Sequence, residues 1–248
     1  MKKDAPAKEY IGDNEVFADI FNRFLELQGD EKIKPQNLVS LETDVRTTYR
    51  KGSSLEIIQK QRDVFKAIAK SDSKLIYLIL GIENQDEVHY AMPIKNMAYD
   101  VAEYARQIES FHHAVNAQKG GKGRPKLNSA TFLSGIGKDD KLIPVITLVV
   151  YMGKTEWDGP LSLHKMFDDN RYSRLLKYVP DYGINLIKPF MMSKEELEQY
   201  ESDFGDVIRF IQEAAKGEIA LNQLIANNPK YENMKLSAGK FIVSAVPF

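Results

Sequence analysis

The sequence has 248 residues, of which 43% are apolar and 10% aromatic, enough to fill one large domain or a domain with an appendage. It contains no cysteine, which excludes disulfides, thiolate metal sites and a cysteine nucleophile and is typical of a reducing compartment. The formal net charge of −1 argues against a strongly basic nucleic-acid-binding domain, although it allows a local basic rim around an acidic site.

Neither a signal peptide nor a membrane span is expected. Residues 1–10 are charged and lack an apolar core, unlike a secretory signal. The longest apolar run, residues 142–152, is interrupted by Pro144 and Thr147 and has about half the length needed to cross a bilayer. We therefore expect a cytoplasmic protein without a membrane partner.

The first third of the chain predicts one helix followed by strands. Apolar residues recur at helical spacing through 13–25, with Asp13 placed as the N-cap, and residues 34–37 are expected to form a loop. Residues 62–68 and 75–82 predict two strands joined by a short turn. The second strand is almost wholly apolar, as expected for a strand buried on both faces.

The middle of the chain predicts a brief extension, a long helix, a loop and another buried strand. The extension is expected at residues 88–91 and the helix at 93–117, where apolar residues recur every three or four positions. Glycines and basic residues at 118–126 indicate a flexible loop. Residues 142–151 are rich in β-branched side chains and predict a buried strand, with Trp157 expected to pack on Tyr151 in the following loop.

The C-terminal part is expected to be helical. Residues 193–196 have the pattern of a capping box, and residues 204–216 predict a helix stopped by Gly217. The chain stops in the apolar run 241–246, a pattern found in whole chains and in pieces of longer ones, and truncation after Phe248 is left open.

The order of these elements predicts an α/β fold. The first two strands are joined by a turn too short for a parallel crossover, which excludes a simple βαβ repeat. A mixed sheet flanked by helices is the arrangement that this order favours.

Polar residues at two neighbouring strand ends form the candidate site. Asp63 lies at the start of one strand, and Glu83 and Gln85 lie at the end of the next, on one face because side chains alternate. Antiparallel pairing of these strands brings Asp63 beside Glu83. Two adjacent carboxylates are costly without a cation between them, and oxygen ligands suit Mg²⁺ or Mn²⁺. Taken alone, the pattern is also typical of a turn residue and a solvated strand end.

Five sequence blocks resemble a known family. They occur in order at residues 17–22, 62–64, 80–85, 90–93 and 149–163, with the last block reading VVYMG…WDGPLSL. Together they resemble the recombination-promoting nuclease family, also called PD-(D/E)XK nuclease family transposases, over roughly residues 10–240. The resemblance implies a PD-(D/E)XK α-β-β-β-α-β core, which matches the predicted order. We expect a nuclease-like domain at residues 10–190 and a helical extension at 191–248, packed on it or following it.

The resemblance also implies roles for the site residues. Asp63 matches the motif aspartate, Glu83 matches the motif (D/E), and the backbone carbonyl of Asn84 would face the metal ion, Mg²⁺ or Mn²⁺. Gln85 stands where most of the superfamily has lysine, and it lacks the charge and the proton that lysine supplies.

Further residues have less direct roles. The resemblance implies outer-shell carboxylates at Glu15 or Asp13. The residues Lys119, Lys122, Arg124 and Lys126 are candidates for DNA backbone contacts, and a solvated connecting loop is the alternative.

The expected function is a Mg²⁺-dependent DNA endonuclease of low sequence specificity that promotes recombination or accompanies mobile elements. The alternative is a catalytically weak or inactive protein of the same fold that binds DNA or protein, which Gln85 and the near-neutral charge favour. A homo-oligomer is also considered. The three acidic residues of an RNase H-like transposase are not evident in the sequence.

Overall fold

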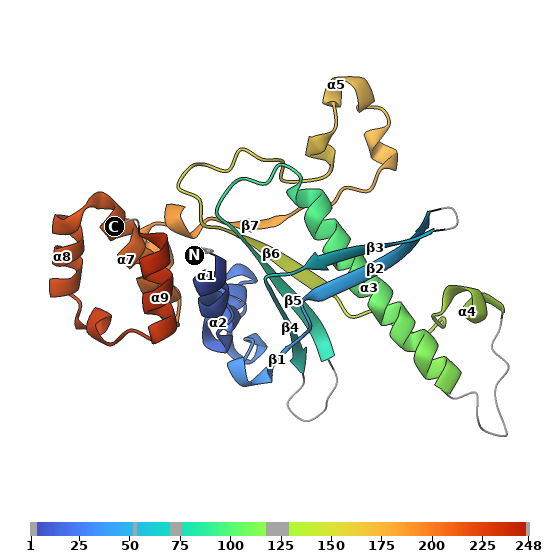
Figure 1. The fold of residues 1–248 in the computed structure, drawn as a ribbon, viewed down its shortest axis with the longest axis horizontal. Coiled ribbons are helices and arrows are strands. Elements are labelled where there is room, and N and C mark those ends of the chain that lie inside the picture. Colours follow the sequence, from blue (N-terminus) through green and yellow to red (C-terminus); the bar gives the residue numbers. More distant parts are fainter. Residues whose placement is uncertain (1–3, 52–53, 70–75, 118–128, 247–248) are drawn as a thin grey trace.

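The computed structural model describes residues 4–51, 54–69, 76–117 and 129–246. Figure 1 shows a twisted central sheet with helices on both sides. The strands are β1 (Leu38–Ser40), β2 (Asp44–Lys51), β3 (Ser54–Gln61), β4 (Val64–Ala69), β5 (Ile76–Gln85), β6 (Val145–Tyr151) and β7 (Asn185–Ile187). The α-helices are α1 (Asp4–Ile11), α2 (Asn14–Phe24), α3 (Met92–Ala117), α4 (Ser129–Ser134), α5 (Asp169–Tyr172), α6 (Lys194–Leu197), α7 (Phe204–Lys216), α8 (Glu218–Ala226) and α9 (Leu236–Ala245).

The central sheet has five strands in the order β1-β4-β5-β6-β7. The pairs β1–β4 and β4–β5 are antiparallel, whereas the pairs β5–β6 and β6–β7 are parallel. The mixed sheet and the α/β class predicted from the sequence are therefore confirmed. A separate antiparallel hairpin, β2–β3, was not predicted.

Helix α3 is the crossover that the parallel pair β5–β6 requires, and Figure 1 shows it lying across one face of the sheet. Helices α1 and α2 lie on the other face. Their side chains share a hydrophobic core with alternate residues of β5 and β6 and with helices α7 and α9. Phe17, Leu80, Leu148 and Phe204 are all fully buried in this core.

The C-terminal helices pack directly on the N-terminal one. Tyr10 of α1 stacks on Phe241 of α9 with ring centroids 5.4 Å apart, and the Tyr10 hydroxyl donates a hydrogen bond to Asp203 over 2.8 Å. The two ends of the chain contribute to one core. The domain boundary expected between residues 190 and 191 remains a prediction.

Several local predictions are confirmed. Asp13 caps α2 by accepting from the N–H groups of Glu15 and Val16, the capping box at Ser193 and Glu196 is present, and α7 ends at Gly217. Gly217 has φ +117°, which a residue with a side chain rarely adopts.

One local prediction is wrong. The extension at residues 88–91 is a turn, closed by a hydrogen bond of 2.9 Å from the Met92 N–H to the His89 carbonyl, so the chain enters α3 at once. The loop expected at residues 34–37 contains a 3-10 turn, Pro35–Asn37. None of the helices in the described part of the chain is long and apolar enough to cross a membrane.

Candidate functional site

Asp63 precedes β4 and Glu83 lies near the end of β5, so both residues are at the same end of the central sheet. The antiparallel ladder begins with the pair Val64 and Ile82, so Asp63, the residue before Val64, lies beside the end of β5 where Glu83 follows Ile82. The Asp63 carboxylate also accepts a hydrogen bond of 2.8 Å from the backbone N–H of Asn84. The structure therefore brings Asp63 to the end of β5, next to the residues singled out from the sequence.

Glu83 is fully buried, in the region where α3 covers the sheet. The ammonium of Lys95, in the first turn of α3, forms an ion pair with Oε2 of Glu83 at 3.0 Å. Oε1 has no hydrogen-bond partner among the described residues. Burial raises the pKa of Glu83 to about 7, because removal from water disfavours the carboxylate, while Lys95 opposes the shift and Asp63 adds to it.

Asp63 has its own lysine. Nζ of Lys8, from α1, lies 2.7 Å from Oδ1 of Asp63, whose side chain is largely buried. Each carboxylate is thus paired with a cation from a different helix, Lys8 from one side of the sheet and Lys95 from the other. This charge balance offsets the repulsion between two acidic groups at neighbouring strand ends.

Asn84 and Gln85, the two residues that follow Glu83, are joined by a hydrogen bond. The Gln85 amide donates a hydrogen bond of 2.7 Å to the backbone carbonyl of Asn84, the group that the family resemblance gives to the metal. The side-chain oxygen of Asn84 is buried without a hydrogen-bond partner in the described part of the protein. Gln85 therefore braces the strand end and brings no positive charge to it.

The donor set fits a small divalent cation. Asp63, Glu83 and the Asn84 carbonyl offer hard oxygen atoms, and the unpartnered Oε1 of Glu83 is a buried acceptor. No group of three or more His, Cys, Asp or Glu side chains placed to hold a metal ion occurs among the described residues, so water would have to fill much of the coordination shell. That requirement suits Mg²⁺, which keeps several waters when protein-bound.

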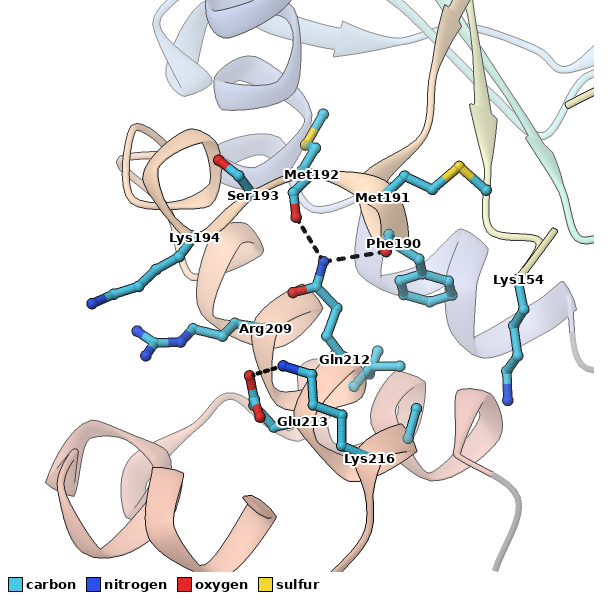
Figure 2. Close-up of a pocket in the computed structure, with 12 residues that line it drawn as sticks. Lys154, Phe190, Met191, Met192, Ser193, Lys194, Arg209, Gln212, Glu213 and Lys216 are labelled. Carbon is cyan, nitrogen blue, oxygen red and sulfur yellow. Dashed lines mark hydrogen bonds and ion pairs between the residues drawn. The ribbon is translucent and has the colours of Figure 1, made fainter. Parts of the chain in front are cut away.

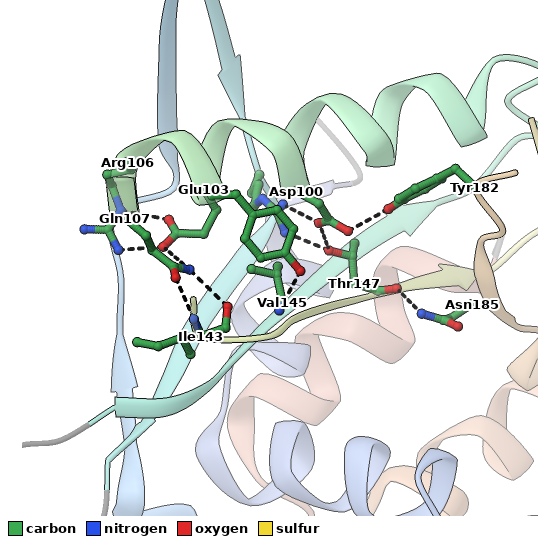
Figure 3. A network of polar contacts seen from close by, with 11 residues as sticks. Asp100, Glu103, Arg106, Gln107, Ile143, Val145, Thr147, Tyr182 and Asn185 are labelled. Atoms are coloured by element: carbon green, nitrogen blue, oxygen red, sulfur yellow. Dashed lines mark hydrogen bonds and ion pairs between the residues drawn. The ribbon is translucent and has the colours of Figure 1, made fainter. Parts of the chain in front are cut away.

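A buried polar network holds the start of β4, and its parts appear in Figure 3. The guanidinium of Arg62, which is 1% exposed, donates to Asp100 of α3 and to Thr147 of β6, each over 2.9 Å. Thr147 and Tyr182 also donate to Asp100, at 2.7 and 2.6 Å. Because Arg62 directly precedes Asp63, this network positions the candidate site. Sequence reasoning missed it, because no local pattern marks a buried arginine.

Arg62 also depends on a glycine. A Cβ at Gly81 would overlap Nη1 of Arg62, so only glycine leaves room for the guanidinium on this face of β5. The guanidinium lies between two rings, with Cζ 4.5 Å from the Phe65 centroid and 5.0 Å from that of Tyr99. These contacts replace some of the solvation that a buried charge loses.

The other predicted residues lie elsewhere. Asp13 and Glu15 form ion pairs with Lys235, at 3.7 and 2.5 Å, and the outer-shell role remains a prediction. Trp157 packs edge-on against Tyr151 with ring centroids 5.2 Å apart, as expected. The basic residues Lys119, Lys122, Arg124 and Lys126 lie outside the described residues.

Two cavities lie near the carboxyl ends of the strands. One, of about 340 Å³, is lined by residues that include Ala7, Asp86 and Tyr151, the neighbours of Lys8 and Gln85 in sequence or register. The second, of about 510 Å³, is drawn in Figure 2 and lies between residues 190–194 and α7. The Gln212 amide closes it by donating to the carbonyls of Phe190 and Met192. Neither Asp63 nor Glu83 lines this second cavity.

The fold and the site define an α/β protein with a mixed sheet and paired carboxylates at the edge where two central strands meet. A family model described as "Putative transposase, YhgA-like" matches residues 35–230, most of the chain. The chain belongs to this family, which confirms the family resemblance inferred from the sequence. Neither the curated proteins nor the solved structures include a match to the chain.

Proposed function

We propose that this protein hydrolyses phosphodiester bonds in DNA, using a divalent metal ion held by Asp63 and Glu83. The observation that carries the proposal is the pair itself: two carboxylates at adjacent strand ends, one with a buried, unpartnered oxygen. The membership in a family of putative transposases supports DNA as the substrate. When bound, Mg²⁺ or Mn²⁺ would polarise the scissile phosphate and lower the pKa of a water molecule.

The order of elements supports a PD-(D/E)XK core. Helix α2, strands β1, β4 and β5, helix α3 and strand β6 follow the α-β-β-β-α-β sequence of that core. In this assignment Asp63 begins the second core strand and Glu83 ends the third. The hairpin β2–β3 is then an insertion between the first two core strands.

The residues of this chain would divide the work. Asp63 and Glu83 supply negative charge for the ion, and the Asn84 carbonyl adds a neutral oxygen once it is free of the Gln85 amide. Lys95, which already reaches Glu83, supplies the positive charge that Gln85 lacks. With metal ion and DNA bound, the Lys95 ammonium would leave Glu83 and contact a phosphate oxygen, where it would stabilise the negative charge that develops. Arg62 acts through Asp63 by fixing the start of β4.

Conversion of supercoiled plasmid tests the proposal. The wild-type protein is expected to nick plasmid in Mg²⁺ or Mn²⁺ and to lose this activity in EDTA. Glu83→Gln and Asp63→Asn should abolish it. Glu87→Gln makes the same change at an exposed residue four positions on and should cut like wild type. Equal cutting by all three variants would remove the paired carboxylates from the mechanism.

A second function is favoured by a specific observation. Both carboxylates are already paired with lysines, and the Gln85 amide is directed to a neighbouring carbonyl, so a charge-balanced site could bind DNA or protein without cleaving DNA. In that case the intact protein would bind DNA in Ca²⁺ and leave plasmid uncut in Mg²⁺ and Mn²⁺.

A further inference from the structure

A small projecting lobe, residues 161–183, leaves the sheet between β6 and β7. Figure 1 shows α5 at its tip, beyond the N-terminal end of α3. Its neck is held by an antiparallel bridge between Ser162 and Gly183 and by hydrogen bonds of 2.9 Å that join residue 184 to 161 and residue 163 to 182. We call this segment the lobe.

The lobe has almost no core of its own. None of its residues whose exposure is described is buried, and apolar side chains lie open to solvent. Leu175 is 56% exposed and Tyr178 is 75% exposed. Exposed apolar groups gathered on one projection are typical of an interaction surface.

Four cations accompany these side chains: Lys165, Arg171, Arg174 and Lys177. All four are exposed, and none forms an ion pair with an acid in the described part of the chain. Two carboxylates of the lobe bond to backbone groups instead: Asp168 accepts from the N–H groups of residues 170 and 171, and Asp181 accepts from that of His164.

The spacing of the cations is regular. Hydrogen bonds from Leu175 N–H to the Tyr172 carbonyl and from Tyr178 N–H to the Leu175 carbonyl wind this stretch in three-residue turns. Arg171 belongs to α5, Arg174 to the turn that follows it and Lys177 to the 3-10 turn Leu176–Tyr178. The three cations therefore recur every third residue along one short stretch of the lobe, each next to Tyr172, Leu175 or Tyr178 in sequence.

Two of these cations lie close to the rings beside them. The guanidinium of Arg171 is 5.4 Å from the Tyr172 ring centroid, and the ammonium of Lys177 is 4.9 Å from that of Tyr178. Cations interspersed with aromatic rings provide both phosphate contacts and stacking surfaces, the combination with which proteins hold nucleic acid without reading its sequence.

The lobe is linked to the candidate site through its neck. Tyr182 donates a hydrogen bond of 2.6 Å to Asp100 of α3, and Asp100 accepts from Arg62, the residue before Asp63. The same helix carries Lys95, which contacts Glu83. The neck of the lobe and the two candidate carboxylates are therefore both tied to α3.

We infer that the lobe is a DNA-binding element, in which Arg171, Arg174 and Lys177 contact successive backbone phosphates and the neighbouring aromatic rings pack on the strand. The inference rests on the proposed function, because it names the surface that would hold the substrate of that site. Acidic lipid surfaces are the other class of partner that such a lobe could attract.

The test compares two triple variants with equal loss of charge. The lobe variant is Arg171→Ser, Arg174→Ser and Lys177→Ser. The control is Lys34→Ser, Lys138→Ser and Lys141→Ser, three exposed lysines before β1 and β6, at the other end of the sheet. Binding to a labelled duplex is measured by fluorescence anisotropy in Ca²⁺ at several salt concentrations, after circular dichroism has verified that both variants fold.

The lobe variant should bind at least about tenfold more weakly, and its salt slope should fall by roughly 2 to 3 units, because each lost phosphate contact removes close to one. The control should match wild type. If wild type binds and cuts DNA while the lobe variant keeps its affinity and slope, the lobe inference is overturned and the proposed function stands. If wild type binds no duplex at low salt, both fall. Loss of binding to phosphatidylserine vesicles with unchanged DNA binding would assign the lobe to lipid and also overturn the inference.

Discussion

The ammonium of Lys95 lies 3.0 Å from Oε2 of Glu83, and this ion pair joins the first turn of α3 to the end of β5. Glu83 is fully buried, whereas the Lys95 side chain is 22% exposed. The lysine is therefore partly accessible from solvent, while the carboxylate that it neutralises is not. Its contribution to stability should depend on pH.

Lys95→Met should destabilise the protein, and the loss should grow as pH rises. At low pH Glu83 is protonated and needs no counter-charge, whereas above a pKa of about 7 the wild-type carboxylate is ionised beside Lys95. Without the lysine the buried carboxyl would keep its proton to higher pH, so the loss of stability at pH 8, one unit above the wild-type pKa, should be about 1.4 kcal/mol at most. Urea unfolding at pH 5 and pH 8 measures it. Lys141→Met, at an exposed position, should show no such growth.

Glu83→Gln should remove a pH dependence that wild type shows. The folded pKa of about 7 lies above the ordinary value of 4.5, so below pH 4.5 the carboxyl is protonated in both states and contributes nothing. As pH rises from 4.5 to 7, the unfolded chain ionises first, and wild-type stability falls by up to about 3 kcal/mol. The glutamine variant should be more stable than wild type at pH 8 and similar at pH 4. A variant that loses stability equally at both pH values would show that Glu83 stays ionised throughout.

Gly81→Ala should disturb the candidate site through Arg62, the residue that precedes Asp63. The added methyl group would overlap Arg62, which has no free space because Asp100, Thr147 and two rings surround it. Overpacking of this kind costs about 1 to 3 kcal/mol. Gly239→Ala is the control, because a Cβ there meets nothing within 4 Å and the position lies in α9, where alanine is favoured by roughly 0.5 to 1 kcal/mol. Thermal unfolding of the two variants should therefore shift in opposite directions.

The sequence predicted what depends on local pattern. Helix α3 and strands β4, β5 and β6 follow from apolar periodicity, and the antiparallel β4–β5 pair follows from a turn too short for a crossover. The proximity of Asp63 to the end of β5 comes from that pairing. The hairpin β2–β3 was missed because its residues mix polar and apolar types without a clear period.

What the sequence could not supply is the partners that tertiary packing brings in. Lys8 lies 55 residues before Asp63, in a helix that was itself not predicted, yet its ammonium contacts that carboxylate. Lys95 was part of a predicted helix, but periodicity alone does not say that its ammonium reaches Glu83. The candidate site predicted from the strand ends therefore included the carboxylates Asp63 and Glu83 but not the lysines that pair with them.

The last prediction concerns metal binding without catalysis. Mn²⁺ or Mg²⁺ bound to the folded state alone should raise the unfolding temperature, by an amount equivalent to about 2.7 kcal/mol when the ion is at 100 times its Kd. Glu83→Gln and Asp63→Asn should lose this shift, because each removes an ionised oxygen, whereas Glu87→Gln should keep it.

The shift should also depend on pH, since Glu83 must be deprotonated to bind the ion. It should be small at pH 5.5 and grow through the pKa of about 7, with proton release on binding. Differential scanning fluorimetry with EDTA-treated protein measures both effects without any nucleic acid present. A shift that survives in both carboxylate variants would locate the ion elsewhere on the chain, and the site formed by Asp63 and Glu83 would then be a lysine-balanced structural pair.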